Sequence, residues 1–480
     1  MATETKRDSM EASLSELKST ISSTHITSPE SPKRPISFTS LPSSLRNKIY
    51  AYVLDTELVN VGAPNVSYTH SIKDSVLHFK ASRPPFPVET ALFYVSKQVS
   101  KEALQFFYER GLWVKFTVYS PDARHTKTML EDSGVLFSVA ENEKVEECNS
   151  HAMDIVLVEK SSAVKRATVM FPAQYLPRLV NFMEQASRAS GSWAASHALY
   201  LTLRNTYEKE VASVQGDLLE GWRLLTGMGK VGVDKDNTLE GYAEGLEDSM
   251  LAAGFDAEKW LETVRGMVTK AEDAKHAKDY ETAAQHCKAA IISMTYGYLT
   301  RAESLHSQPE AFHKSIQRLR YTTELTLGTS LLAPHTDLLT TTPLSWLSTL
   351  TLSRAQTATR LLAAEIALSR ALSISTDSPS PASNPWYRSL PPELIPPNNA
   401  TWFSEAEQGR SWFERGRAHL ALGEPLFAAG DLERAERMLQ GDKEVGETFE
   451  RARETIDWST SPGCNTRLVA RAARADHWIR

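Results

Sequence analysis

Two short motifs contain residue types that can carry out chemistry. Cys148 and His151 form a Cys-x-x-His pair, which is half of the ligand set of a closed structural zinc site. The run GMGKVG, residues 227–232, has the letters of the glycine-rich loop that holds a dinucleotide pyrophosphate. No second pair with zinc spacing follows the first motif. We therefore expect no metal at Cys148 and His151.

The surroundings of the glycine-rich run argue against a nucleotide. In dinucleotide enzymes this loop follows a strand and opens a helix, so that backbone amides meet the pyrophosphate. Here the preceding residues 217–226 have a helical pattern, and residues 230–237 read as a strand followed by a turn. We expect these glycines to end a helix and start a strand, and we expect no cofactor.

Other catalytic patterns are absent from the sequence. It contains no nucleophile elbow of the Gly-x-Ser-x-Gly type, no His-Glu-x-x-His and no phosphate-binding loop. His125, His197 and His286 are scattered, and each is expected to be a surface or core-edge histidine. The sequence predicts that the protein is not an enzyme. An enzyme whose site is assembled from distant residues stays open as a third interpretation.

Composition and charge set the class of protein. The chain has 480 residues, 41% hydrophobic and 23% charged, which is typical of a soluble globular protein with two or three domains. Its net charge of -6 predicts no nucleic-acid partner, and no apolar run is long enough to predict a membrane span. The N-terminus lacks a signal-peptide core and the three cysteines lie far apart, so we expect a cytoplasmic and/or nuclear location.

The composition along the chain predicts a mainly α fold with a smaller α+β N-terminal part. Residues 1–35 are polar, are expected to be disordered, and carry two Ser-Pro sites at Ser28 and Ser31. The expected domains that follow are a helical module with a β insertion at 36–112, a small α/β layer at 113–235, and a helical domain at 236–480 with a Pro-rich interruption at 375–400.

Two helical patterns define the first module. Ser40 can cap the first helix, and Pro42 suits its first turn. Two short β-rich pieces, residues 57–63 and 75–81, precede the second helical pattern at 91–111, which ends at Gly111. The apolar faces are Leu41, Leu45, Ile49 and Val53 in the first helix and Leu92, Val95, Val99, Ala103 and Phe106 in the second.

The runs LPSSLRNKIYAYVL, ALFYVSKQVSKEAL and LW resemble an F-box, in the form common in fungal proteins. This resemblance covers about a sixth of the chain. It implies that the module docks the adaptor subunit of a cullin-type (SCF) ubiquitin ligase while the rest of the chain captures an unknown protein substrate. The implied partner-binding residues are Leu41, Pro42, Leu45, Ile49, Tyr52, Val53, Val95 and Ser96.

A purely structural interpretation explains the same apolar stripes. Ser44 stands where the F-box pattern prefers glutamate, and roughly 35 residues separate the two helical pieces, far more than an ordinary helix connection. In this alternative the two helices pack on each other without a partner. The two interpretations differ in whether Leu41, Leu45 and Ile49 are exposed or buried.

The middle of the chain mixes strands and helices. Strand-like runs lie at 112–119, 152–160, 164–172 and 197–205, and the helical stretch 176–190 separates the last two. The polar stretch 131–151 is expected to be a loop. This alternation favours a small α/β or α+β layer that supports the first module.

The second half is almost wholly helical and rich in alanine. Residues 271–290 and 418–440 resemble the tetratricopeptide repeat (TPR), and residues 354–374 form a weaker third candidate. Pro425 is expected inside a first helix of such a repeat, where it interrupts the pattern. The resemblance implies a groove that binds a peptide or protein; the alternative is a plain helical bundle.

Together these patterns predict a protein-interaction adaptor. The alternative is an intracellular helical-repeat scaffold, without a ligase role, whose F-box-like helices are only structural.

Overall fold

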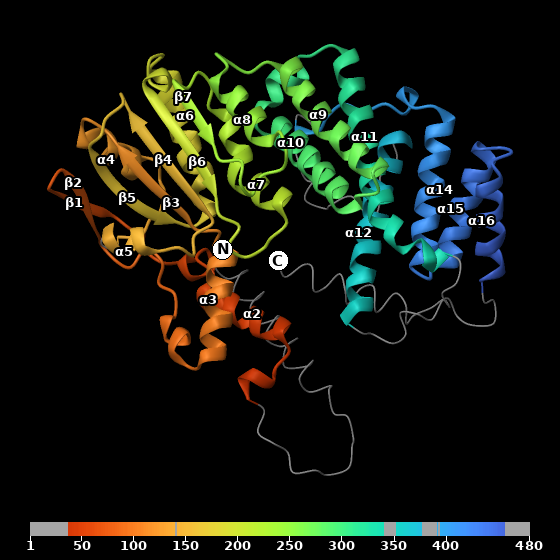
Figure 1. The fold of residues 1–480 in the computed structure, drawn as a ribbon, viewed down its shortest axis with the longest axis horizontal. Helices are drawn as coiled ribbons and strands as arrows, with labels where there is room; N and C mark the ends of the chain where they lie inside the picture. Colours follow the sequence, from red (N-terminus) through yellow and green to blue (C-terminus); the bar gives the residue numbers. More distant parts are fainter. Residues whose placement is uncertain (1–36, 140–141, 340–351, 377–390, 392–393, 457–480) are drawn as a thin grey trace, which may run out of the picture. The chain divides into compact units, whose positions relative to one another are not determined.

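The computed structural model describes residues 37–139, 142–339, 352–376, 391 and 394–456 (Figure 1). Ser28, Ser31 and most of the Pro-rich stretch 375–400 lie outside them, so the predictions made for these residues are untested. The chain divides into two compact units, residues 1–46 and residues 47–480. Its elements confirm a mainly α chain with a smaller α+β N-terminal part.

The first described element is a single 3-10 turn, η1 (Phe38–Ser40), followed by α2 (Ser43–Leu54). The Ser40 hydroxyl donates to the carbonyl of Ser37 within the 3-10 turn, at 2.6 Å. Pro42 immediately precedes the helix, and its carbonyl accepts the amides of Leu45 and Arg46 at 3.0 and 3.1 Å. The expectation that Ser40 caps this helix is therefore wrong, because the helix begins three residues later.

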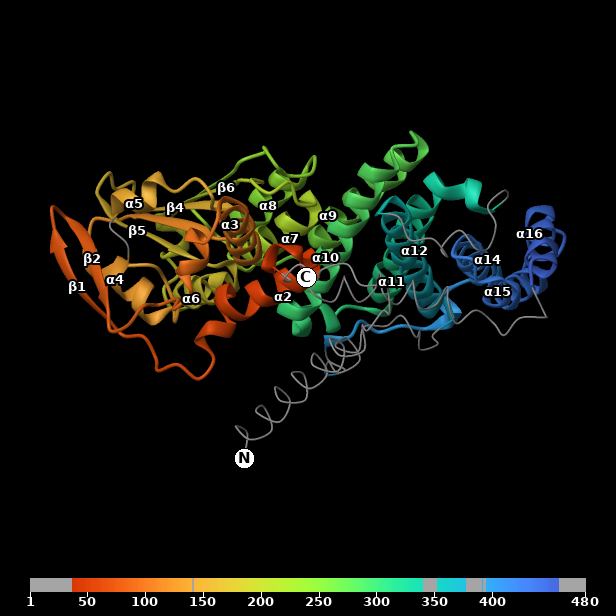
Figure 2. The ribbon, with the colours of Figure 1, turned by 90° about the horizontal axis from the view of Figure 1, so that it is seen from below.

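The β insertion has its first strand at a different place from the one predicted. Residues 58–60 form a 3-10 turn, η2 (Leu58–Asn60), in place of the first predicted strand. An antiparallel ribbon follows, made of β1 (Tyr68–Lys73) and β2 (Val76–Ala81). Figure 2 shows this ribbon at the edge of the sheet region, beside α4 (Ala123–Asp132).

The second predicted helix is split into two elements. A 3-10 helix, η3 (Thr90–Tyr94), precedes α3 (Lys97–Gly111). Leu112 takes the left-handed conformation that ends α3, with φ of 42°. Gly111 has a different role, because a Cβ there would lie 2.8 Å from the indole nitrogen of Trp113. Glycine at this position leaves space for the Trp113 side chain, and the left-handed turn itself is made by Leu112.

A five-stranded mixed sheet forms the core of the α+β part, in the order β5-β3-β4-β6-β7. Its strands are β3 (Val114–Tyr119), β4 (Met153–Glu159), β5 (Lys165–Phe171), β6 (His197–Leu203) and β7 (Lys230–Val233). The β3–β4 and β6–β7 pairs are parallel, and the β3–β5 and β4–β6 pairs are antiparallel. The chain therefore skips β3 when it passes from β4 to β5.

One face of this sheet is buried. Phe116, Ile155 and Leu201 lie side by side in register on β3, β4 and β6 and are buried, whereas the residues between them along each strand are half-buried. This strict alternation is the pattern of a sheet covered on one side. The connecting helices are α4, α6 (Leu176–Ala189), α7 (Val211–Leu219), the 3-10 helix η6 (Glu220–Leu224) and α8 (Tyr242–Leu251).

A short helix occupies part of the predicted loop 131–151. This helix is α5 (Asn142–Glu147), and it packs on β5. Residues 131 and 132 belong to the end of α4. The loop prediction is therefore wrong at both places. At α5 the reason is that a polar composition does not prevent a short helix whose single apolar residue, Val145, is buried.

The remaining helices pack in chain order, which is the arrangement of a helical-repeat protein (Figure 1). Small residues lie at their contacts, among them Ala283, Gly328 and Ala428. Pro425 is the first residue of a helix rather than an interior residue, so it does not interrupt the array. The helices are α9 (Ala257–His276), α10 (Tyr280–His306), α11 (Glu310–Leu332), α12 (Leu352–Thr376), α14 (Glu405–Ala421), α15 (Pro425–Met438) and α16 (Lys443–Glu454).

Turns between these helices use specific residues. Lys278, with φ of 63°, and Asp279 separate α9 from α10, and the Asp279 carboxylate accepts the amide of Thr282 at 3.1 Å. Gly423, with φ of 70°, stands between α14 and α15. These two turns coincide with the two TPR-like segments of the sequence. The third segment, 354–374, lies within the single helix α12.

Candidate functional site

The N-terminal module has an inner face that satisfies its own packing. On α2, Tyr50 and Leu54 are buried, and on α3 Val99 and Ala103 are buried. The ring of Tyr50 lies 5.9 Å from that of Phe106, and its hydroxyl donates to Glu102 at 3.2 Å. The residues of α2 that face the core are thus Tyr50 and Leu54, one position after the stripe that ends in Ile49 and Val53.

Several apolar residues of the same module remain exposed. Ile49 is 40% exposed and Tyr52 is 62% exposed, and their spacing of three places them on neighbouring positions of one helix face. Tyr94 and Val95, which end η3 and follow it, are 85% and 64% exposed. We call these four the outer residues. They contribute little to the core of the chain.

The predicted partner-binding residues do not all behave alike. Pro42, Ile49, Tyr52, Val95 and Ser96 are exposed, and none of the eight is buried. The remaining three, Leu41, Leu45 and Val53, are half-buried. The carbonyl of Val53 accepts the amide of Glu89 at 3.0 Å, which ties α2 to the segment before η3.

Ser96 has a structural role in this module. It is the N-cap of α3, and its hydroxyl accepts the amide of Val99 at 3.2 Å. Tyr94 is the most exposed outer residue, and sequence reasoning missed it. The periodic apolar pattern predicted one continuous helix here. The spacing of the residues does not indicate the 3-10 helix that leaves Tyr94 exposed.

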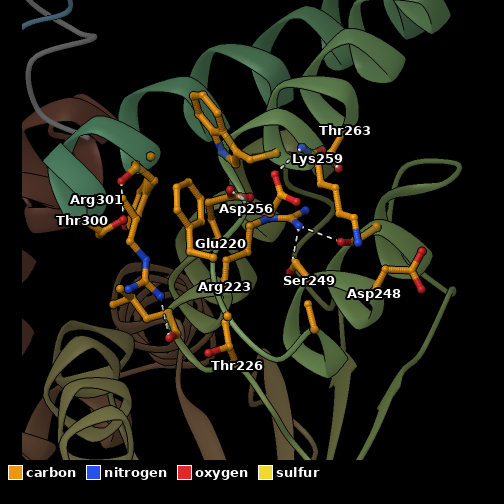
Figure 3. A pocket seen from close by; sticks show the side chains of 18 of the residues that line it. Glu220, Arg223, Thr226, Asp248, Ser249, Asp256, Lys259, Thr263, Thr300 and Arg301 are labelled. Atoms are coloured by element: carbon orange, nitrogen blue, oxygen red, sulfur yellow. Dashed lines mark hydrogen bonds and ion pairs between the residues drawn. The ribbon is translucent and has the colours of Figure 1, made fainter. Parts of the chain in front are cut away.

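A cavity of about 600 Å³ lies where η6 and α8 meet α9 and α10 (Figure 3). This volume is within the range of small-molecule sites. Its apolar lining includes Phe255 and Trp260, and its cations include Lys259 and Arg301. Gly297 lets α10 approach Trp260, because a Cβ there would collide with the indole ring. No sequence motif indicates this cavity, since its residues come from four separate helices and the loops between them.

The buried polar groups beside the cavity form hydrogen bonds with one another. Glu220 accepts hydrogen bonds from Tyr242 at 2.6 Å, Ser293 at 2.9 Å and Arg223 at 3.0 Å. Burial alone would lower the pKa of Arg223, but Glu220 outweighs that effect and the pKa is raised. The network connects η6, α8 and α10. It contains one buried ion pair, between Glu220 and Arg223.

A third group of polar residues lies between α5 and the outer face of the sheet. Cys148, half-exposed, directly follows α5, and its sulphur lies 3.9 Å from the hydroxyl oxygen of Tyr108. Nε2 of His151 lies 2.9 Å from Oδ1 of Asp154 on β4, and the His151 side chain is fully buried. The Asp154 carboxylate also pairs with Lys115 at 3.2 Å and with Arg204.

The pKa shifts in this group reinforce one another. The neighbouring His151 side chain lowers the pKa of the Cys148 thiol. Burial alone would lower the pKa of His151, but the neighbouring Asp154 and Cys148 raise it. Burial would likewise raise the pKa of Asp154, but His151 and Arg204 hold it well below its ordinary range.

The other residues considered for chemistry have local roles. The ring of His125 lies 3.0 Å from the carboxylate of Glu159, and His197 stacks on Trp193 at 4.1 Å. Burial lowers the pKa of His197 and of His286. The glycine-rich run follows η6 and leads into β7, so its context is helix before strand as expected.

Among the described residues, no group of three or more His, Cys, Asp and Glu side chains is placed to hold a metal ion. In the same part of the chain, no helix has both the length and the apolar content needed to cross a membrane. No protein-family model, no curated protein and no solved structure matches this chain.

Proposed function

We propose that the protein is an interaction adaptor that docks the adaptor subunit of a cullin-type ubiquitin ligase through its N-terminal module. The observation that supports this most is the exposure of Ile49, Tyr52 and Val95, three residues that the F-box resemblance implies as contacts. Large apolar side chains that no core uses are a common feature of protein-binding surfaces.

The helical part supplies the second half of the proposed function. Helices α9 to α16 pack in chain order, as in repeat proteins that hold a peptide or protein partner. In this proposal they recruit a protein substrate of unknown identity. The runner-up is a helical-repeat scaffold with no ligase role, in which α2 and α3 serve only their own inner face of Tyr50, Leu54, Val99 and Ala103.

A pulldown tests the docking role. Purified wild-type protein is mixed with the ligase adaptor subunit and cullin, alongside the double variant Ile49→Ala and Tyr52→Ala. Because both side chains are exposed, the variant should keep its far-ultraviolet circular dichroism. Loss of two interface anchors should reduce capture by at least about tenfold.

A matched control removes an aliphatic and an aromatic residue elsewhere, Ile72→Ala with Phe427→Ala, which are 57% and 43% exposed. Its capture should equal that of wild type. No capture by wild-type protein would favour the scaffold. Equal capture by both double variants would exclude Ile49 and Tyr52 as contacts.

A further inference from the structure

The cavity formed by η6, α8, α9 and α10 contains a cation that has no carboxylate partner within the described residues. This cation is Arg301 on α10, a half-buried residue whose Nη2 donates to the carbonyl of Leu224 at 2.9 Å (Figure 3). A guanidinium has several more N–H donors than this one bond uses. Burial lowers the pKa of Arg301, because the charge has lost hydration without gaining an ion pair.

The neighbours of Arg301 hold the guanidinium but do not neutralise it. The charged groups of α6 that act on it are Glu184 and Arg188, and these two form an ion pair with each other. The guanidinium carbon lies 5.4 Å from the centre of the Phe255 ring, which places the cation against an aromatic wall. An anion that enters the cavity can therefore supply the ion pair that Arg301 lacks.

The carboxylates that line the cavity are either already hydrogen-bonded or exposed. Glu220 accepts the three hydrogen bonds described above. Asp256 is exposed and is the N-cap of α9, and Asp248 and Glu262 are also exposed. The sheltered charge without a partner is thus the positive charge of Arg301. The exposed carboxylates disfavour a ligand that carries more than one negative charge.

Two aromatic side chains form much of the apolar wall. The ring centres of Phe255 and Trp260 lie 6.4 Å apart, and their planes are inclined by 55°. Trp260 is buried, and its ring also packs against Tyr298 and Phe312, with centres 6.4 and 6.5 Å away. The indole is therefore fixed in place, and a flat apolar ligand can pack against this wall without rearranging it.

We propose that this cavity is a binding site for a small aromatic monocarboxylate. The aromatic body of the ligand lies against Phe255 and Trp260, and its carboxylate pairs with Arg301. The cavity volume of about 600 Å³ is sufficient for a ligand of this class. The proposal does not depend on the docking role of α2, since none of the residues that line the cavity belongs to the N-terminal module.

The first measurement compares three probes that share one ring system: 2-naphthoate, its neutral amide 2-naphthamide, and 2-naphthyl phosphate. Each is mixed with the wild-type chain and followed by saturation-transfer NMR. A titration of 2-naphthoate should give a Kd of about 1 mM or lower. At equal concentration, 2-naphthamide should give at most about a tenth of its signal, because the amide lacks the charge. Absence of 2-naphthoate binding, equal signals from the amide, or tighter binding of the phosphate would overturn the proposal.

Substitution of Arg301 locates the carboxylate. Arg301→Gln should raise the Kd of 2-naphthoate by at least about tenfold, because the ion pair is lost. The matched control is Arg265→Gln on the same part of the chain, since Arg265 is an exposed residue of α9 that does not line the cavity. Its Kd should equal that of wild type. Equal weakening by both variants would indicate a general effect of charge and would contradict a site at Arg301.

A second variant keeps the test decisive if Arg301→Gln fails to fold. Arg301→Lys retains a cation and a donor for the carbonyl of Leu224, but it loses the planar fork that pairs with a carboxylate. It should raise the Kd of 2-naphthoate by about threefold. An unchanged Kd in this variant would contradict pairing between Arg301 and the carboxylate.

The aromatic wall is tested by Phe255→Leu, which keeps an apolar side chain at this half-buried position. Loss of the ring contact should raise the Kd of 2-naphthoate by about three- to tenfold. Phe427→Leu, at an exposed phenylalanine of α15, serves as the control and should leave the Kd unchanged. An unchanged Kd in Phe255→Leu, or equal weakening by both variants, would contradict the placement of the aromatic body against Phe255.

Discussion

The sheet part and the helical part of residues 47–480 are stabilised in opposite ways. The sheet buries large side chains in register, with Phe116, Ile155 and Leu201 fully covered on one face. The helical part brings backbones close through small residues, such as Gly328 and Ala428. The first arrangement is sensitive to lost volume, and the second is sensitive to added volume.

The largest effect is expected from removing volume in the sheet. Phe116→Ala should lower the free energy of unfolding by about 3–5 kcal/mol, since the ring is fully buried and its neighbours on β4 and β5 are held by strand pairing. Urea unfolding followed by circular dichroism measures the change. A loss below about 1 kcal/mol would mean that the surrounding side chains close the space left by the ring. The sheet would then not be sensitive to lost volume.

Adding volume between helices should have the next largest effect. At Gly328 on α11 a Cβ would lie 2.5 Å from Cγ of Leu368 on α12 and 3.1 Å from the carbonyl of Ala364. Gly328→Ala should cost about 2 kcal/mol, because a branched carbon and a backbone oxygen cannot both move aside cheaply. The midpoint of urea unfolding reports it. A stabilised variant would show that α11 and α12 can move apart to admit the added methyl group at little cost.

A charged group on the outer face of the sheet should contribute less, and only above a certain pH. Because His151 and Arg204 lower the pKa of Asp154 in the folded chain, its contribution is present above about pH 4 and is lost as the pH falls. Asp154→Asn should cost roughly 1.5 kcal/mol at neutral pH. The charges that face it are those of His151, Lys115 and Arg204.

The test for Asp154 is the difference in unfolding free energy between wild type and variant as a function of pH. This difference should shrink as the pH falls below about 4, since the carboxylate takes up its proton first in the unfolded chain and only at lower pH in the folded chain. A difference that stays constant with pH would attribute the loss to packing rather than to charge.

The smallest effect has the opposite sign and serves as the matched control for Gly328. Gly266 lies within α9, and a Cβ there would meet nothing within 4 Å. Gly266→Ala should stabilise the chain by about 0.5–1 kcal/mol through helix propensity alone. Thermal unfolding measures the gain. Equal destabilisation at both glycines would point to flexibility, not close packing, as the reason for glycine in these helices.

The strands of the five-stranded sheet and the long helices were predictable from sequence because most of them repeat one simple period. The run 153–159 alternates buried and half-buried residues, and residues 257–276 show the helical period. Element ends were harder. The spacing of Leu41 to Val53 placed the core-facing stripe one residue before Tyr50 and Leu54, because the short apolar helix has candidates on more than one face.

The polar site was only half predictable. Cys148 and His151 could be paired by their spacing, but the pair was weighed as a metal half-site. Asp154 follows three residues after His151 on a strand, and nothing in the letters indicates that its carboxylate turns back to the imidazole. The cavity beside Arg223 and Glu220 was not predictable, since it requires η6, α8, α9 and α10 to be in place.

The chain-order packing of α9 to α16 has a consequence for how this chain reaches its structure. The contacts α9–α10, α10–α11, α14–α15 and α15–α16 close short loops, whereas β5 pairs with β3 although the whole of β4 lies between them in the sequence. Bringing distant segments together costs more chain entropy, and this cost comes before any favourable contact forms. The helical part can therefore form early and rapidly on its own neighbours, and assembly of the sheet should set the overall folding rate.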